Sequence, residues 1–266
     1  MPEKHPVNPL FKFLVGACGW SIGLAPGLAL AMTVPLCPTQ NAEAGTDGRV
    51  LGHLPYGQGA EADLLPAPPG FAIGGPCRLH RAAMVDLIRL LQAADTVPGV
   101  AGTLRGVSCF RPIEYQRQVF CAQIGQGQRF ANAAERARVA APPAYSEHAT
   151  GYTLDFAVRP SPDCPDVDAC IIWHPAGRWL LAHARDFGFE LSFPAGNAQG
   201  VSWEPWHWRW VGVSPKAPGA AAARAVFARA AAKYPAIPGV YLKPPPVVPT
   251  LPRPGFPLYW PRVPGL

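Results

Sequence analysis

Charged residues are scarce in this chain, and the basic ones never gather in a run. Of 266 residues, 23 are Lys or Arg and 17 are Asp or Glu, which leaves a formal net charge of +6. Proteins that bind nucleic acid concentrate Lys and Arg in patches, so this scattered pattern predicts no nucleic-acid partner. A modest positive charge still favours an anionic polymer by general electrostatic attraction.

Several motifs are absent as well. No two cysteines have the spacing C-x-x-C, which argues against a zinc site built from cysteines. The chain contains no S-x-x-K motif, which argues against a serine carboxypeptidase of the penicillin-binding type. It also contains no phosphate-binding glycine loop and no internal repeat.

Apolar residues, in contrast, make up 49% of the chain, enough to build the core of one sizeable domain. At the N-terminus, Lys4, His5 and Lys12 precede an apolar stretch over residues 13–31 that ends in Ala29-Leu30-Ala31. This pattern predicts a signal peptide and export to the periplasm or cell envelope. Because the stretch approaches the length that spans a bilayer, an uncleaved membrane anchor is the alternative.

The chain has seven cysteines, of which Cys18 lies inside the predicted signal segment. An even set of six follows it, which suits an oxidising compartment and disulfide bonds, although free buried thiols are the alternative. Cys164 and Cys170 can close a small loop. Cys109 and Cys121 can pair with each other, or either can pair with Cys77, and the sequence does not choose.

Apolar residues at helical spacing and breaker residues between segments predict alternating helices and strands. Helices are expected over residues 78–94, 113–124, 129–140, 177–187 and 220–233, the fourth ending at Gly188. Strands are expected over residues 99–109, 152–158, 189–193 and 206–211. In the strand over 152–158, alternation places Leu154 and Phe156 on one face and Thr153 and Asp155 on the other.

The remaining segments have no sustained period. Residues 39–75 are rich in Gly, Pro and Ala and are expected to form an N-terminal arm without regular elements. The expected organisation is therefore a signal peptide or membrane anchor over 1–31, a linker over 32–47, one α+β domain over 48–233, and an extended Pro-rich tail over 234–266.

Two segments concentrate residues that bind metals. The first runs from Ser146 to Asp155 and includes His148, and the second, Trp203-Glu204-Pro205-Trp206-His207-Trp208-Arg209-Trp210, includes Glu204 and His207. A catalytic zinc site takes three nitrogen or oxygen ligands and leaves the fourth position to water. Taken alone, a His near a Gly is usually a hydrogen-bonded structural residue, and a Trp-rich strand is usually core. Together, the two segments complete one metal site.

The same two segments resemble the S-x-H-x-x-G-x-x-x-D and E-x-W-H signatures of the D-Ala-D-Ala carboxypeptidases of the vancomycin-resistance type, the VanY-like family. The segment Ser108-Cys109-Phe110-Arg111-Pro112-Ile113-Glu114-Tyr115-Gln116 resembles the family stretch S-G-Y-R-S-x-x-x-Q, with Cys109 in place of a usual Gly. The resemblance covers roughly residues 50–213. It implies an α+β domain with a small antiparallel sheet that carries the zinc site and is flanked by helices, as in hedgehog-like domains.

Carried over to this sequence, the resemblance implies that His148, Asp155 and His207 bind Zn²⁺ and that Glu204 is the catalytic base. Arg111 would stabilise the oxyanion of the tetrahedral intermediate. Two further residues, Ser146 and Gln116, would bind substrate, although capping of a helix or loop explains both equally well. His53, His80, His174 and His183 have no partner spacing and are expected to be structural.

The leading hypothesis is a secreted, monomeric zinc exopeptidase that removes the terminal D-Ala from peptidoglycan stem peptides. Two alternatives stay open. One is an endopeptidase of the same zinc chemistry that cuts an internal bond of the stem or cross-bridge. The other is a non-catalytic zinc module that binds cell wall, although the presence of Glu204 counts against it because zinc binding alone does not need that residue.

Overall fold

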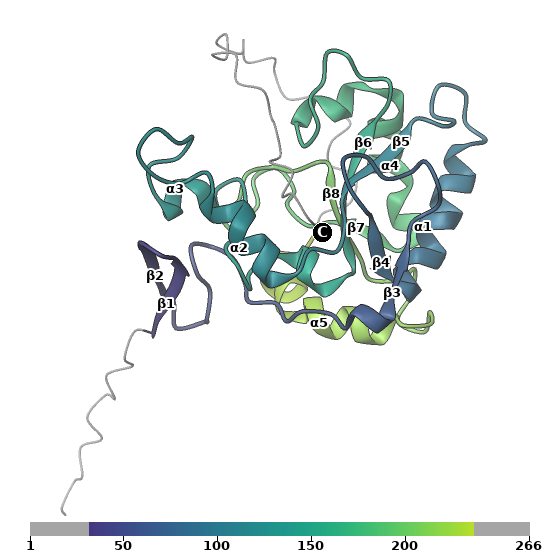
Figure 1. Cartoon of the computed structure of the whole chain (residues 1–266). Coiled ribbons are helices and arrows are strands. Elements are labelled where there is room, and N and C mark those ends of the chain that lie inside the picture. The colour runs from purple at the N-terminus through teal and green to yellow at the C-terminus, as the bar shows by residue number, and fades with distance from the viewer. Residues whose placement is uncertain (1–31, 237–266) are drawn as a thin grey trace, which may run out of the picture. The chain divides into compact units, whose positions relative to one another are not determined.

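The computed structural model describes residues 32–236, and its centre is a four-stranded antiparallel sheet in the order β5-β6-β8-β7 (Figure 1). The strands are β5 (Leu104–Ser108), β6 (Thr153–Val158), β8 (His207–Trp210) and β7 (Phe189–Leu191). Helices flank this sheet, so the α+β class and the small antiparallel sheet expected from the sequence are confirmed.

Five α-helices belong to the domain: α1 (Arg81–Ala94), α2 (Ile113–Cys121), α3 (Ala133–Ala137), α4 (Pro175–His183) and α5 (Ala220–Lys233). The last of them has the predicted bounds. The helix predicted over 177–187 is α4 followed by a 3-10 turn, η4 (Ala184–Phe187). That turn ends at Gly188, whose φ of 80° lies in the left-handed region that glycine adopts without strain.

Strand β6 belongs to both the core and the site. All six of its residues are buried. Leu154 and Phe156 point into the main hydrophobic cluster, where α1 contributes Leu87, α4 contributes Leu180 and α5 contributes Phe227. The alternation predicted from the sequence is therefore correct, but the opposite face is covered too. That face carries Thr153 and Asp155, and it is where the candidate site lies.

Three predicted helices are shorter in the structure, and the one predicted over 113–124 ends at Cys121. The helix predicted from residue 78 begins at Arg81, because Arg78–His80 form β4, which pairs antiparallel with β3 (Leu64–Pro66). The His80 side chain then caps α1 by accepting a hydrogen bond from the backbone of Ala82. The helix predicted over 129–140 is only α3, which Asn132 caps through the backbone N–H of Glu135.

The arm before residue 75 is more regular than predicted. Residues 32–47, expected as a linker, hold a hairpin of β1 (Met32–Cys37) and β2 (Gln40–Ala44). A disulfide from Cys37 to Cys121 fastens this hairpin to α2, and Leu36 is fully buried beside Phe120. Also in the arm are β3 and the turn η1 (Glu61–Asp63). Sequence patterning missed these elements because strands of three to six residues with mixed burial show no clean alternation.

The other disulfides fall among the pairings that the sequence left open. Cys77 is bonded to Cys109, and Cys164 to Cys170. All six cysteines after the predicted signal segment are therefore paired, as their even number indicated. The signal peptide or anchor over 1–31 and residues 237–266 of the tail lie outside the described residues, and the domain boundaries stay predictions. Within residues 32–236, no helix has the length and apolar character needed to cross a membrane.

His53 makes the free energy of unfolding depend on pH. The side chain is 2% exposed and donates from Nε2 to the carbonyl of Ala137 at 2.7 Å. Burial lowers the pKa of this imidazole from 6.5 to about 4. The unfolded chain therefore binds a proton below pH 6.5 while the folded chain does not, so stability falls as pH drops from 6.5 towards 4. At about pH 5 the loss from this residue is about 2 kcal/mol.

Urea unfolding of the metal-free protein near pH 7 and near pH 5, compared with His53→Gln, measures this contribution. We expect the difference between the two pH values to shrink by about 2 kcal/mol in the variant. The same pH dependence in both proteins would show that the His53 ring is not the group responsible.

Candidate active site

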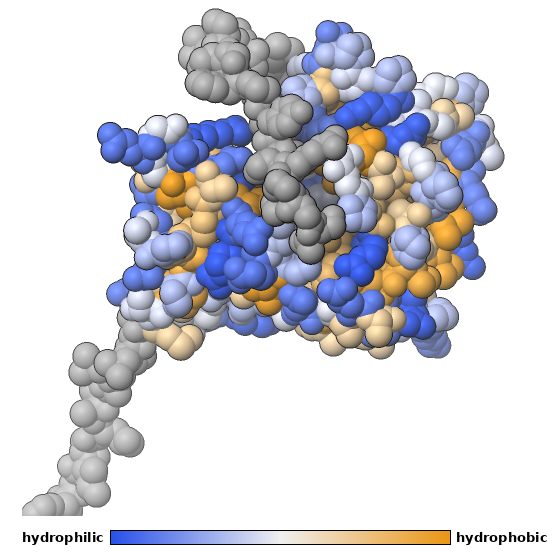
Figure 2. Space-filling model, viewed as in Figure 1, coloured by the Kyte–Doolittle hydropathy of each residue, from blue (hydrophilic) through white to orange (hydrophobic). Residues whose placement is uncertain are grey.

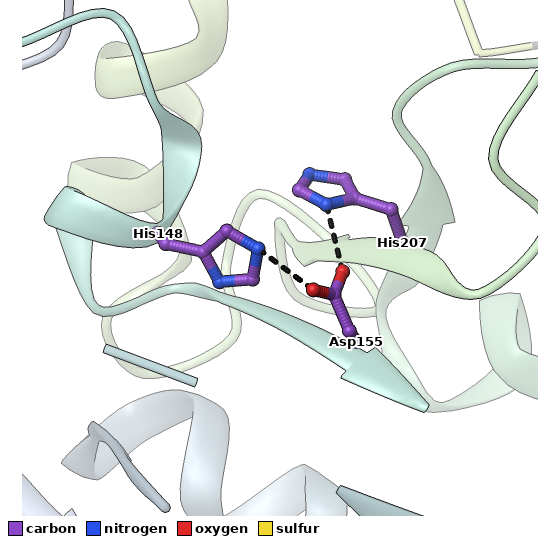
Figure 3. Close-up of side chains that lie close together, drawn as sticks. All are labelled: His148, Asp155 and His207. Carbon is purple, nitrogen blue, oxygen red and sulfur yellow. Dashed lines mark hydrogen bonds and ion pairs between the residues drawn. The ribbon is translucent and has the colours of Figure 1, made fainter. Parts of the chain in front are cut away.

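Three side chains predicted to bind a metal converge in the structure (Figure 3). His148 comes from the 3-10 turn η2 (Glu147–Thr150), Asp155 from the middle of β6, and His207 from the start of β8. Their ligand atoms all lie within 4.8 Å of one another, and all three residues are buried. One nitrogen from each His and one carboxylate oxygen form a donor set typical of zinc.

The backbone accounts for this convergence. Strands β6 and β8 pair antiparallel with Asp155 directly opposite His207, which places both side chains on one face of the sheet. His148 is brought alongside by Gly151, which links η2 to β6 with a φ of 79°. The positive φ favours glycine at this position, and a Cβ there would lie 2.8 Å from Leu64 Cδ2, so the Leu64 side chain would also have to move.

The His148 imidazole is oriented by the backbone. Its Nδ1 donates to the carbonyl of Cys109 at 2.8 Å, and its Nε2 lies 3.2 Å from Asp155 Oδ2. Burial lowers the pKa of His148, which favours the neutral ring. The lone pair of a neutral ring that is protonated at Nδ1 lies on Nε2, facing Asp155 and His207. A hydrogen bond from the second ring nitrogen to a carbonyl is typical of metal-binding histidines.

His207 is held by carboxylates on both sides. Its Nε2 donates to Glu147 Oε2 at 3.1 Å, and its Nδ1 lies 2.9 Å from Asp155 Oδ1. Burial alone would lower the pKa of His207, but the hydrogen bonds to Asp155 and Glu147 outweigh it and raise the pKa to about 10. In the metal-free protein His207 is therefore cationic, and a metal ion at Nδ1 would take the place of a proton.

Glu147 is the functional residue that the sequence analysis missed. Its side chain is 2% exposed and accepts hydrogen bonds from His207, from Ser192 Oγ at 2.5 Å, from Tyr56 at 3.1 Å and from Arg209 Nη1 at 2.9 Å. Burial raises the pKa of Glu147, but the charge of Arg209 and the hydrogen bond from His207 more than offset it, so the pKa lies below its usual range. The residue lies within the first motif, yet its partners come from distant segments.

Glu204 lies beside the three ligands but is not held by them. Its Oε2 is 3.8 Å from His207 Nδ1, and among the described residues its carboxylate accepts no hydrogen bond. Burial, together with the negative charges of Asp155 and Glu147, raises the pKa of Glu204 to about 8, while the positive charges of His207 and Arg111 oppose the rise. A carboxyl group that titrates near neutral pH can both accept and return a proton.

Arg111, the predicted oxyanion-binding residue, also lies beside the three ligands. Its backbone N–H donates to the carbonyl of His148 at 3.1 Å, and its Nη1 donates to Ser108 Oγ at 3.2 Å. The side chain is buried, and its Nε has no hydrogen-bond partner among the described residues. Its charge interacts with those of Asp155 and Glu204. An unpaired N–H of a buried guanidinium is suited to an oxygen atom supplied by a ligand.

The two residues expected to bind substrate are also buried. Ser146 is 3% exposed, and its hydroxyl does not cap η2, which removes the capping explanation. Gln116 is fully buried, and its Nε2 donates to the carbonyl of Ala141 at 2.5 Å. Its Oε1 has no partner among residues 32–236 and could accept a hydrogen bond from a ligand. All seven predicted site residues are therefore buried, and contacts or charge interactions link Arg111 and Glu204 directly to the His148, Asp155 and His207 group.

Comparison with known proteins agrees with this geometry. The family model of the VanY D-alanyl-D-alanine carboxypeptidases matches residues 76–213, just over half of the chain, and includes all seven predicted site residues and Glu147. The chain belongs to this family. Its members are peptidases, so membership indicates a hydrolase and fits the fold and the ligand set.

Individual relatives match over shorter or more distant stretches. A D-alanyl-D-alanine carboxypeptidase from Enterococcus faecium is 33% identical over 79 residues, which is 29% of this chain and 23% of that protein. This chain therefore spans about a quarter of the length of that curated relative. Among solved structures, the LdcB LD-carboxypeptidase shares the fold with a TM-score of 0.50 and 23% identity, over 66% of this chain and 77% of its own. The vancomycin resistance D,D-pentapeptidase VanY, as a mutant in complex with Zn(II), has a TM-score of 0.43 at 25% identity, over 56% and 84% of the two chains.

Proposed function

We propose that this chain is a zinc-dependent carboxypeptidase that hydrolyses the terminal D-Ala-D-Ala bond of peptidoglycan stem peptides in the cell envelope. Membership of the VanY family supports the reaction class. The observation that carries the catalytic proposal is the Glu204 carboxyl group, which is buried beside the three ligands and accepts no hydrogen bond from the described residues. Such a group costs stability, and its retention is expected where it serves the reaction.

The three ligands fit zinc by their chemistry. His148 Nε2, a carboxylate oxygen of Asp155 and His207 Nδ1 would hold the ion, because the other ring nitrogen of each His donates to Cys109 or to Glu147. Two of the three donors are thus oriented by hydrogen bonds before any metal binds. When bound, zinc supplies Lewis acidity, which polarises a carbonyl group and makes water a nucleophile at neutral pH.

The remaining steps use residues of the chain itself. Glu204 would take a proton from the attacking water and return it to the departing amine of D-Ala, a transfer that its pKa of about 8 allows in both directions. The Arg111 guanidinium, with its unpaired Nε, would donate to the negative oxygen that develops on the scissile carbonyl. Both groups are buried, which strengthens these electrostatic interactions.

Metal removal tests the proposal. The purified protein is treated with a chelator and then given zinc, and D-Ala release is measured from a stem pentapeptide that ends in D-Ala-D-Ala. We expect release to fall by about 100-fold or more in the metal-free protein and to return with one equivalent of zinc but not with magnesium.

Two further substrates identify the alternatives. A tetrapeptide tests cleavage of an L,D bond, the bond type named for the LdcB relative. A cross-linked dimer tests internal cleavage. Zinc-dependent trimming of the tetrapeptide alone would make the D,D assignment wrong, and cutting of the dimer alone would establish the endopeptidase. Zinc binding without cleavage of any of the three would leave a binding module.

A further inference from the structure

Two buried arginines near the candidate site have no carboxylate partner. Arg111 is 9% exposed and Arg136 is 6% exposed. Among residues 32–236, no Asp or Glu oxygen lies within 4.0 Å of either guanidinium, although other arginines such as Arg209 and Arg159 form such pairs. A buried cation without a counter-charge is costly, so an unpaired one points to an anion supplied from outside the chain.

The side chain of Arg136 lies between α3 and α2. Its Nη2 lies 3.4 Å from the carbonyl of Val119, a long contact for a hydrogen bond, and its guanidinium carbon lies 5.2 Å from the ring centre of Phe130. Its Nε has no partner within the described part of the chain. Most of the five N–H donors of this guanidinium are therefore not used by the fold.

The residues that follow α3 are hydrogen-bonded to two segments that contain site residues, the loop with Glu204 and the helix with Gln116. The backbone N–H of Ser202, two residues before Glu204, donates to the carbonyl of Arg138 at 3.1 Å. Gln116 donates to the carbonyl of Ala141. Arg136 therefore lies directly before a segment that contacts the Glu204 loop through Arg138 and the Gln116 helix through Ala141.

The charge of Arg136 interacts with those of Arg111 and Glu204. Burial and the positive charges of Arg129 and Arg111 together lower the pKa of Arg136 to about 10, and the negative charge of Glu204 opposes this shift. The positive charges of Arg111 and Arg136 thus repel each other, and both interact with the carboxyl group of Glu204. Two guanidinium charges therefore face the single carboxyl group of Glu204, so the local excess of charge is positive.

We propose that Arg136 binds the free C-terminal carboxylate of the substrate. The inference deepens the proposed function and rests on it, because an exopeptidase must recognise the chain end next to the scissile bond. Arg111 donates to the developing oxyanion and Arg136 to the permanent charge of the carboxylate, so the two guanidinium groups hold different oxygens. A planar guanidinium matches a carboxylate in a two-pronged geometry.

Equilibrium binding tests this role without turnover. In a Glu204→Gln background, calorimetry compares N-acetyl-D-Ala-D-Ala with its C-terminal amide. We expect the acid to bind about 30-fold more tightly than the amide, and Arg136→Gln to remove most of that preference. Arg136→Lys, which keeps the charge but not the fork, is expected to retain part of it. Arg129→Gln is the matched control, because Arg129 is exposed. The loop between α2 and α3, to which Arg129 belongs, lies at the left edge of Figure 1, where the surface in Figure 2 is mostly hydrophilic.

An unchanged acid preference in Arg136→Gln would overturn the inference, as would an equal loss in Arg129→Gln. Zinc content and circular dichroism of each variant show whether the fold and the metal site are intact. D-Ala release by the protein with Glu204 judges the proposed function separately. Release with an unchanged acid preference in Arg136→Gln rejects only the role of Arg136. No release, together with loss of the preference in Arg136→Gln, rejects only the proposed reaction. If neither compound binds, the role of Arg136 is wrong whatever the enzyme assay shows.

Discussion

Replacing Glu204 by Gln is expected to lower D-Ala release by about 1000-fold or more while zinc still binds. Gln has nearly the same shape as Glu but cannot accept a proton from water. Two backbone hydrogen bonds keep the residue in place, from Glu204 N–H to Phe193 and from His207 N–H to Glu204. The substitution therefore removes the proton acceptor and leaves the loop as it is.

The same substitution is expected not to destabilise the fold. Within residues 32–236, the Glu204 carboxylate accepts no hydrogen bond that its removal could break, and burial already disfavours its charge. The free energy of unfolding should stay within about 1 kcal/mol of the original value or rise. Initial rates and bound zinc are measured together, with the exposed Glu43→Gln as control. More than about one tenth of the original activity in Glu204→Gln would mean that another group accepts the proton.

Replacing Glu147 by Gln is expected to have a large effect on stability. Four donors converge on this carboxylate, two of which, His207 and Arg209, are buried cations in the metal-free protein. A neutral amide cannot balance them, and its NH₂ group must face at least one donor. Breaking one partner of a buried ion pair typically costs about 3–5 kcal/mol. Because Glu147 orients His207, zinc affinity is also expected to fall, by about 10- to 100-fold.

Glu190→Gln is the matched control for this prediction. Glu190 accepts a hydrogen bond from the same Arg209, through Nε at 2.7 Å, but its side chain is 26% exposed and it does not contact His207. We expect it to cost about 1 kcal/mol in urea unfolding and to leave zinc affinity unchanged. Equal zinc affinity in Glu147→Gln and the original protein, measured by competition with a chelator, would show that His207 does not depend on Glu147 for its orientation.

The sequence predicted the candidate site better than its surroundings, for a physical reason. His148, Asp155, Glu204 and His207 stand in two short motifs whose spacing reflects one turn and two strands, so local sequence contains most of the information. Glu147 stands in the same motif, but its importance depends on residues such as Tyr56 and Arg209, more than fifty positions away. No local pattern encodes such a network.

Arg136 and the first hairpin were missed for similar reasons. A buried arginine in an Ala-rich helix reads as a surface residue, since Arg is seldom buried without a partner. The β1–β2 hairpin depends on packing of Leu36 against Phe120 and on the disulfide between Cys37 and Cys121. Both contacts join parts of the chain about eighty residues apart. Elements stabilised by distant partners carry weak local signals, whereas the Ala-rich α5 was predicted with its observed bounds.

Because Asp155 and His207 lie on paired strands, the metal site forms only when β6 and β8 pair in the correct register. In β8, His207 alternates with Trp208 and Trp210, both of which are buried in the main core. A slip of one residue in register would exchange the two faces of the strand. Such a slip would place an indole ring where the metal ligand belongs and would bury the polar His207 side chain in the hydrophobic core. The burial of Trp208 and Trp210 therefore stabilises the one register in which Asp155 and His207 are paired.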